Sequence, residues 1–132
     1  MEKIRKTLSA CLTEAAGILQ HHFTKIQSHE VETKSRHFDL QTIADTEAEN
    51  AIIKRIQTDF PDHSVYAEES GRATKEGAPA TWIIDPLDGT CNFRFGIPYC
   101  AISIAVEIEG EVRLGTVFNP FQNELFRAEK GK

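Results

Sequence analysis

The apolar residues of this chain change their spacing near Pro61, which divides the sequence into a helical part and a strand-rich part. Between Glu2 and about His29 they recur at steps of three and four, as is typical of an amphipathic helix with one buried face. This stripe consists of Ile4, Leu8, Cys11, Leu12, Ala15, Ile18, Leu19, Phe23 and Ile26. A second helix is predicted to end near Phe60, because Pro61 disfavours helical backbone in the residue before it.

The start of the second helix is ambiguous by one turn. Thr42 followed by Asp45, and Thr46 followed by Glu49, both resemble capping arrangements that place an acid in the first turn. Residues 30–41 are polar with weak alternation, so we predict a loop or a short strand there. The apolar residues that support the second helix are Ala48, Ile52, Ile53 and Ile56.

Beyond Pro61, short apolar runs separated by turn residues predict strands. Residues 71–80 have no packing pattern and are predicted to be a loop, whereas Thr90 and the residues after it can open a helical turn. The predicted strands are 64–67, 82–84, 101–109, 111–118 and 124–128. Two helices followed by a run of strands predict an α+β fold, with two N-terminal helices packed on a largely antiparallel sheet.

Composition narrows the class of protein. The chain has 132 residues, of which 40% are apolar and 27% charged, and its formal net charge is −5. These values are ordinary for a soluble chain with one core, and the acidic balance disfavours nucleic-acid and membrane partners. No apolar run approaches the ~18–20 residues of a membrane span, and the first residues do not resemble a signal peptide. Three cysteines without C-x-x-C spacing predict reduced thiols and a cytoplasmic protein.

Two aspartates at the end of an apolar strand are the most informative residues. Asp85 follows Trp82-Ile-Ile84, and Asp88 follows three residues later. Such a segment turns both carboxylates and the Leu87 carbonyl toward one point, and Mg²⁺ prefers these oxygens at about 2.0–2.1 Å. The alternative is a β-turn in which the two aspartates accept hydrogen bonds from their own backbone amides.

A second acidic cluster favours the metal interpretation. Glu68 ends the 64–67 strand and would meet the aspartates if the two strands are neighbours. Two like charges at ~4 Å repel by about 4 kcal/mol at an effective dielectric of 20, so three carboxylates together require a cation. The amides that follow Gly89 would bind phosphate. Metal and phosphate together indicate metal-assisted phosphoryl transfer to water.

These residues resemble the inositol monophosphatase family. The matching segments are Ala67-Glu-Glu-Ser70 and Trp82 to Thr90 with Asn92-Phe93, supported by 96–98, 103–105 and 129–132. The resemblance covers most of the chain from about Lys34 and implies the N-terminal half of the layered αβαβα sugar-phosphatase fold. Family members are about twice this length, so residues 1–132 are expected to be the N-terminal metal-binding part, with the C-terminal half absent.

The resemblance implies a set of metal ligands. Glu68, Asp85 and the Leu87 carbonyl would bind a first Mg²⁺, and Asp85 with Asp88 a second. A complete site would hold two or three Mg²⁺ ions. For Glu69 we expect support of the site rather than direct ligation.

It also implies catalytic and substrate-binding roles. Thr90 and Asp45 would orient and deprotonate the attacking water beside Glu68, and the amides of Gly89 and Thr90, with Asp88, would bind the phosphate ester. Asp45 as a plain helix-terminal acid is the alternative.

Two further residues near the expected site have open roles. Lys34 is either near the metal-binding loop, as the resemblance implies, or a solvated loop lysine. Cys91 is expected to be a small packed side chain, with a reactive thiol as the alternative.

The expected activity is that of a Mg²⁺-dependent phosphomonoesterase acting on inositol monophosphate or a related sugar phosphate through a metal-activated water. Fructose-1,6-bisphosphate and 3′-phosphoadenosine 5′-phosphate are alternative substrates, and a non-catalytic interaction protein on the same fold is the alternative from another class. The expected partner is thus a small phosphorylated substrate. A homodimer is also expected, because exposed strand edges need covering.

Overall fold

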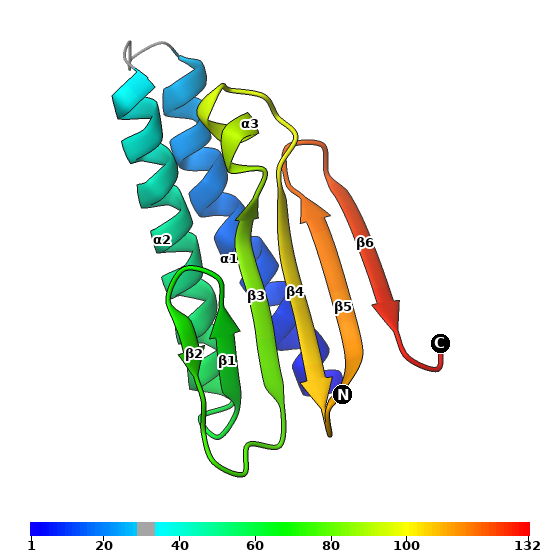
Figure 1. Cartoon of the computed structure of the whole chain (residues 1–132). Coiled ribbons are helices and arrows are strands. Elements are labelled where there is room, and N and C mark those ends of the chain that lie inside the picture. The colour runs from blue at the N-terminus through cyan, green and yellow to red at the C-terminus, as the bar shows by residue number, and fades with distance from the viewer. Residues whose placement is uncertain (29–33) are drawn as a thin grey trace.

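The computed structural model describes residues 1–28 and 34–132, and the side chains of all of these except Lys34 and Ser35. Helices α1 (Glu2–Gln27) and α2 (Lys34–Asp59) lie side by side across one face of a single sheet (Figure 1). The described strands are β1 (Ser64–Ala67), β2 (Gly71–Ala73), β3 (Thr81–Asp88), β4 (Ala101–Ile108), β5 (Glu111–Asn119) and β6 (Glu124–Glu129); a short helix, α3 (Thr90–Arg94), follows β3. The predicted α+β class is confirmed.

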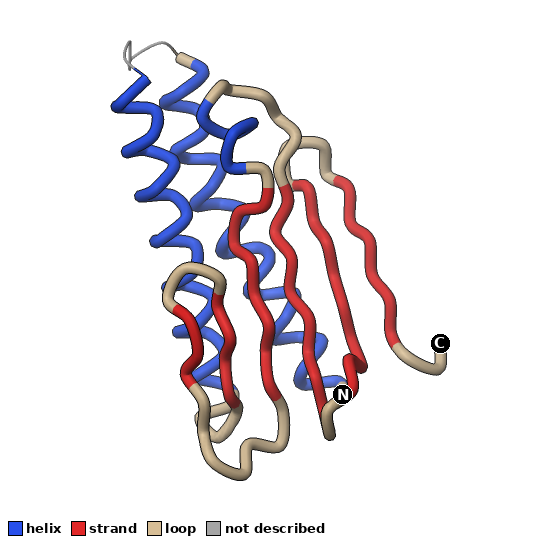
Figure 2. The backbone as a smooth tube through the Cα atoms, viewed as in Figure 1, coloured by secondary structure: helices blue, strands red, loops and turns tan. Residues whose placement is uncertain are grey.

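The sheet is mixed but mostly antiparallel, as predicted. The strands lie side by side in one sheet (Figure 2), in the order β2-β1-β3-β4-β5-β6. Among the described strands, β1 and β3 are the parallel pair, as their arrows show (Figure 1). Ala67, the last residue of β1, pairs with Ile84 in this parallel register, so β1 ends beside the middle of β3, directly before Asp85. The register of β3 against β4 shifts between Asp85 and Asp88, which marks a bulge at that end.

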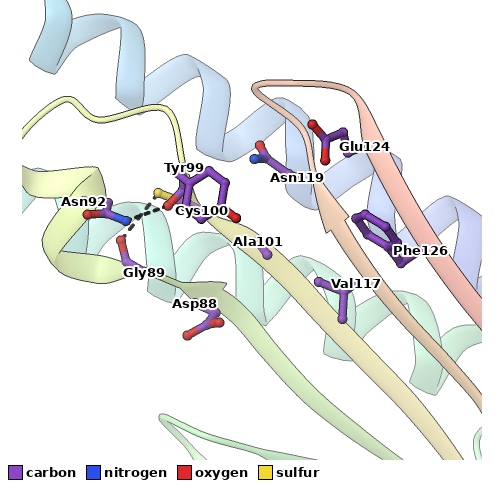
Figure 3. A pocket seen from close by; sticks show the side chains of 10 residues that line it. All are labelled: Asp88, Gly89, Asn92, Tyr99, Cys100, Ala101, Val117, Asn119, Glu124 and Phe126. Carbon is purple, nitrogen blue, oxygen red and sulfur yellow. Dashed lines mark hydrogen bonds between the residues drawn. The ribbon is translucent and has the colours of Figure 1, made fainter.

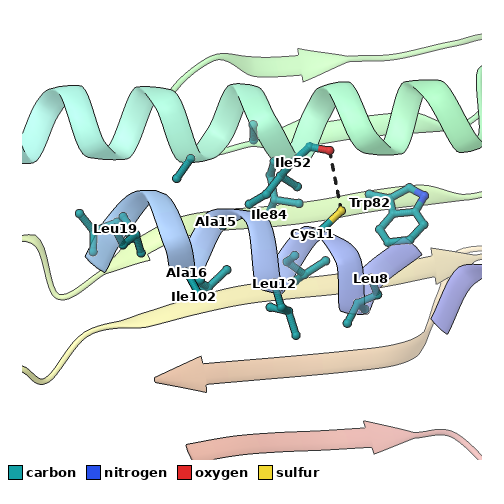
Figure 4. Packing of buried hydrophobic residues seen from close by; sticks show 14 of the residues in the cluster. Leu8, Cys11, Leu12, Ala15, Ala16, Leu19, Ile52, Trp82, Ile84 and Ile102 are labelled. Atoms are coloured by element: carbon teal, nitrogen blue, oxygen red, sulfur yellow. Dashed lines mark hydrogen bonds between the residues drawn. The ribbon is translucent and has the colours of Figure 1, made fainter. Parts of the chain in front are cut away.

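The core lies between the helices and the sheet. The predicted stripe of α1 faces inward, and Cys11, Leu19, Ile52, Trp82 and Ile102 are completely or almost completely buried (Figure 4). Burying a side chain of this size contributes about 1.5–3 kcal/mol, which explains why the stripe dictates the orientation of α1. The helices therefore fix one face of the sheet, against which the site is built.

The predicted start of the second helix was wrong, because α2 begins at Lys34 rather than near Thr42 or Thr46. Thr42 lies within the helix, and its hydroxyl donates to the carbonyl of Phe38 at 3.0 Å. The first turns are held by α3, since Arg94 lies over the Phe38 ring. Residues 30–33 of the predicted loop or strand lie outside the described residues. The inward side chains of α2 recur every four residues, at Leu40, Ala44, Ala48, Ile52 and Ile56.

Two other boundaries differ from the prediction. Residues 71–73 form β2, which pairs with β1 in a hairpin, although 71–80 was predicted to be a loop. Strand β3 continues to Asp88, so Asp85 and Asp88 belong to the strand rather than following it. The predicted first helix, the helical turn from Thr90 and the remaining strands are confirmed. Among the described residues, no helix is long and apolar enough to span a membrane.

Candidate metal and phosphate site

Helix α2 presents two acids to the sheet. Asp45 is 4% exposed and Glu49 is 3% exposed. Residues four apart lie on the same helix face, so both carboxylates point toward the same end of the sheet. Asp45 lies about three turns into α2, and the interpretation of Asp45 as a helix-terminal acid is therefore wrong.

Glu68 and Asp85 are neighbours where β1 ends beside β3. The N–H of Glu68 donates to the carbonyl of Ile84 at 3.3 Å, which continues the pairing of the two strands by one residue. The side chain of Glu68 lies close enough to Asp85 to raise the pKa of the Asp85 carboxyl group. Asp85 Oδ1 also accepts the N–H of Leu87 at 3.2 Å, so the local bond expected for a β-turn is present alongside the contact with Glu68.

The acids destabilise one another's ionised forms. Burial raises the pKa of Asp45 to about 7, with smaller contributions from the negative charges of Glu69, Asp85, Glu49 and Glu68. Burial also raises the pKa of Asp85, and the neighbouring Glu68 raises it further. A cation among these carboxylates would reverse the effect, because an opposite charge favours the ionised forms.

An unpartnered oxygen supports the fit to a hard cation. Asp45 Oδ1 is buried and has no hydrogen-bond partner among the described side chains. A buried polar atom without a partner costs about 1–3 kcal/mol, unless a ligand or water satisfies it. Carboxylate and carbonyl oxygens are the ligands that Mg²⁺ prefers, so the expected donors Glu68, Asp85 and the Leu87 carbonyl, with the Asp45 carboxylate beside them, fit this ion.

The acids are gathered but are not already arranged as a closed cage. Asp88 is exposed at the end of β3, although its charge is close enough to raise the pKa of Asp85. Within the described part of the chain, no three His, Cys, Asp or Glu side chains form a group that could hold a metal ion as they stand. The structure therefore brings Asp45, Glu68 and Asp85 together, with Asp88 on their exposed side.

The turn after Asp88 requires glycine. Gly89 has a φ of 91°, and a Cβ atom there would lie 3.0 Å from the carbonyl oxygen of Tyr99. Asn92 Nδ2 donates to that same carbonyl at 2.9 Å, and Cys100 Sγ donates to the Gly89 carbonyl at 3.4 Å (Figure 3). Thr90, which is partly exposed, begins α3 directly after this turn. The contacts fix Gly89 and Thr90 next to the carboxylates.

A pocket of about 320 Å³ opens beside Asp88 and Gly89. Its lining comes from α3, β4, β5 and β6 as well as from the turn (Figure 3). The sequence did not predict this pocket, because its walls are far apart along the chain. The other lining residues are Asn92, Tyr99, Cys100, Ala101, Val117, Asn119, Glu124 and Phe126.

Three of the remaining sequence candidates have different outcomes. Cys91 is an exposed free thiol, so the expectation of a packed side chain was wrong; Phe93 takes the buried position on α3 instead. The side chain of Glu69 is exposed, and its backbone N–H bonds to Glu49, a residue whose role the sequence did not reveal. The side chain of Lys34 lies outside the described residues.

An α+β layer that brings acids beside a glycine turn contains the oxygen donors that metal-assisted phosphoryl transfer requires. The whole chain, residues 1–132, matches the Inositol monophosphatase family, and it belongs to that family. The resemblance drawn from the sequence motifs is confirmed. Family membership supports a phosphatase-type enzyme of a kind that depends on Mg²⁺.

The similar proteins carry two kinds of name. The chain is 44% identical over 99 residues to an inositol-1-monophosphatase from Synechocystis sp., which covers 75% of the chain and 34% of that protein. It is 43% identical over 94 residues to Nus factor SuhB from Pasteurella multocida, which covers 71% of the chain and 35% of that protein.

Solved structures extend the likeness to the fold. Extragenic suppressor protein suhB from Bartonella henselae has a TM-score of 0.83 and 31% identity, covering 97% of this chain and 48% of that one. Inositol monophosphatase from Anabaena has a TM-score of 0.75 and 27% identity, covering 99% and 44%. The matches thus span about a third of the curated relatives and about half of the solved chains.

Proposed function

We propose that these 132 residues form the N-terminal, metal-binding part of a Mg²⁺-dependent phosphomonoesterase that hydrolyses inositol monophosphate or a related sugar phosphate. The observation that carries the proposal is that Glu68 and Asp85 lie close enough to Asp45 for their charges to raise its pKa, while one buried carboxylate oxygen of Asp45 has no partner among the described side chains. Structural roles alone do not account for this cluster, because Glu68 and Asp85 oppose the ionisation of Asp45, and Glu68 opposes that of Asp85.

The proposed ligand roles are those that the family resemblance implies. Glu68, Asp85 and the Leu87 carbonyl would hold a first Mg²⁺, and Asp85 with Asp88 a second, in a complete site of two or three ions. When bound, Mg²⁺ lowers the pKa of a coordinated water and neutralises charge on phosphoryl oxygens. Asp88 suits the outer position because it is exposed and lines the pocket.

The remaining roles belong to residues beside the cations. Asp45 would accept the proton of the attacking water, and the Thr90 hydroxyl would orient that water. The backbone N–H groups of Gly89 and Thr90 would donate to the phosphoryl oxygens, because amides at the start of a helical turn favour an anion. The pocket beside Asp88 would then receive the alcohol part of the ester.

Phosphate release by the full-length protein in the presence of Mg²⁺ tests this proposal. Asp85→Asn removes a ligand shared by both expected ions, and we expect activity to fall by orders of magnitude. Asp62→Asn is the matched control, because Asp62 is an exposed acid just after α2, before β1 begins. Full activity of Asp85→Asn would overturn the proposal.

The substrate class needs a separate comparison. We propose inositol monophosphate first, with fructose-1,6-bisphosphate and 3′-phosphoadenosine 5′-phosphate as competitors. Turnover of the full-length protein on all three, at equal Mg²⁺, ranks them. A preference for either competitor would keep the metal chemistry and replace the proposed substrate.

A non-catalytic role is the second candidate, and the names of relatives favour testing it. Several similar proteins are named Nus factor SuhB rather than phosphatase, and these names do not support the expected absence of a nucleic-acid partner. A macromolecular partner that is retained by Asp88→Asn, in a protein without phosphatase activity, would favour this role. We also propose a cytoplasmic homodimer, which sedimentation of the full-length protein can test.

A further inference from the structure

The turn between β1 and β2 determines where Glu68 lies. It consists of Glu68, Glu69 and Ser70, because Ala67 and Gly71 already pair with each other across the hairpin. The N–H of Glu68 is satisfied by β3, through the 3.3 Å bond to the carbonyl of Ile84. The next two N–H groups of the turn are satisfied by helix α2, which lies beside this hairpin (Figure 1).

Both of these N–H groups donate to one side chain, Glu49. The N–H of Glu69 lies 3.1 Å from Glu49 Oε2, and the N–H of Ser70 lies 3.1 Å from Glu49 Oε1. Each carboxylate oxygen therefore holds one amide, and the carboxylate spans the turn. Because one rigid carboxyl group accepts two successive backbone N–H groups, it fixes both amides of the turn relative to α2.

The position of Glu49 is otherwise unfavourable. The side chain is buried, and its negative charge is one of those that raise the pKa of Asp45. An apolar residue would suit the packing of α2 better but would leave two N–H groups of the turn without an acceptor. The turn, rather than the core, therefore explains the presence of an acid at this position.

We infer that Glu49 is a positioning residue that holds the 68–70 turn against α2 and thereby sets the Glu68 carboxylate beside Asp85. The inference rests on the proposed function, since Glu68 is taken as a Mg²⁺ ligand. Asp45 and Glu49 share one face of α2, so this helix places Asp45 directly and Glu68 through the turn. Residues that orient metal ligands in this way alter metal affinity about 10–100-fold when they are replaced.

The test uses two variants of Glu49 and two controls in the full-length protein. Glu49→Ala removes both acceptors, whereas Glu49→Gln keeps the length of the side chain and one carbonyl oxygen. Ile52→Val removes a buried methylene group one turn further along α2 and reports general destabilisation. Glu47→Gln removes an acid from the exposed side of the same helix, where it contacts His22 rather than the turn.

The first readout is the Mg²⁺ concentration that half-saturates phosphate release. We expect Glu49→Ala to raise it about 10-fold or more and Glu49→Gln to raise it less, while the maximal rate at saturating Mg²⁺ changes less than the half-saturation point. Ile52→Val and Glu47→Gln should leave it unchanged, because loss of folded protein lowers the amplitude without shifting half-saturation. An unshifted value for Glu49→Ala would overturn the inference.

The second readout does not depend on activity. Hydrogen exchange of the Glu69 and Ser70 amides should be faster in Glu49→Gln than in Ile52→Val, because the protecting acceptor is weakened. Equal exchange in the two variants would overturn the inference even if Glu49→Ala failed to fold. If Asp85→Asn kept full activity, the proposed function would fail, whereas accelerated exchange of these two amides would still show that Glu49 holds the turn.

Discussion

The two ends of β3 use buried polar groups in opposite ways. At the first end, Trp82 Nε1–H donates to His63 Nδ1 at 2.9 Å, and the His63 ring stacks on Phe60. At the second end, Asp45 Oδ1 is buried without a partner among the described side chains, and the neighbouring Glu68 raises the pKa of Asp85. A buried polar group that is satisfied stabilises the fold, whereas unsatisfied and mutually repelling groups indicate a place for a ligand.

The same physical cause shifts the pKa values at both ends. Burial lowers the pKa of His63 and raises the pKa of Asp45, so that the neutral form is favoured in each case. Neutral histidine is the form that accepts the bond from Trp82, so the shift suits its structural role. A neutral aspartic acid does not attract a cation, so Asp45 is fully ionised at neutral pH only when the cation is bound.

The largest effect on activity is expected at the second end of β3, where Asp45 lies. Asp45→Asn should reduce phosphate release by the full-length protein about 100-fold or more, because a general base is lost. The same variant should be more stable than the wild type without Mg²⁺, because it carries one buried charge fewer. Phosphate release and urea unfolding measure the two effects, and a loss of both activity and metal-free stability would contradict the comparison.

At the first end of β3, Trp82→Phe should lower stability without changing the Mg²⁺ requirement. It removes a buried indole and its bond to His63, and we expect unfolding to require about 1–3 kcal/mol less free energy. Half-saturation by Mg²⁺ should stay at the wild-type value, because no acid of the site is touched. A shifted Mg²⁺ requirement would show that the two ends are coupled through β3.

A smaller effect is expected in the pH dependence of stability. The pKa of His63 is lower in the folded protein than its ordinary value of 6.5. The contribution of neutral His63 to the free energy of unfolding is therefore complete above pH 6.5, and it is lost as the pH falls through the folded-state pKa. The Asp62 charge opposes the shift, while Lys3 and Lys75 add to it. Urea unfolding without Mg²⁺ should show this loss in the wild type but not in His63→Gln, which keeps an acceptor and does not titrate.

At the end of β3 near Asp45, stability should depend on pH in the opposite direction. The pKa of Asp45 rises from an ordinary 3.8 to about 7, so its ionisation opposes folding, and metal-free stability increases as the pH falls from 7 towards 4. Asp45→Asn should lack this increase. If Asp45→Asn and His63→Gln changed the pH profile in the same direction, the assignment of opposite roles to the two ends would be wrong.

The smallest effect is expected for Cys91→Ser. Cys91 is exposed on α3, so its replacement should change stability by no more than about 0.5 kcal/mol and leave phosphate release unchanged. A large loss of activity would show that the thiol contributes to the site.

The parts of the fold that the sequence predicted correctly depend on local pattern. The stripe of α1 and the alternation of β4 and β5 repeat over many residues, so their periods are readable without tertiary contacts. The first turns of α2 are polar and were missed, because they are held by the contact of Phe38 with Arg94, far along the chain. Strand β2 was missed because it has only three residues and exists through its pairing with β1.

The candidate site also contains residues that the local sequence reveals and residues that only tertiary contacts reveal. Glu68 and Asp85 were recognisable because each acid interrupts or ends an apolar strand, and the parallel pairing of β1 and β3 brings them together. Glu49 was not recognisable as a functional residue, because its partners are backbone N–H groups, which leave no mark in the sequence. The pocket beside Asp88 was also unpredictable, since several strands contribute to it.

Titration calorimetry of Mg²⁺ into the full-length protein tests the metal site most directly. The account predicts saturable binding by the wild type and by Trp82→Phe, and binding by Asp85→Asn that is weakened at least tenfold. Equal binding by all three proteins, or no binding by the wild type, would contradict the claim that these acids are gathered to hold a divalent cation.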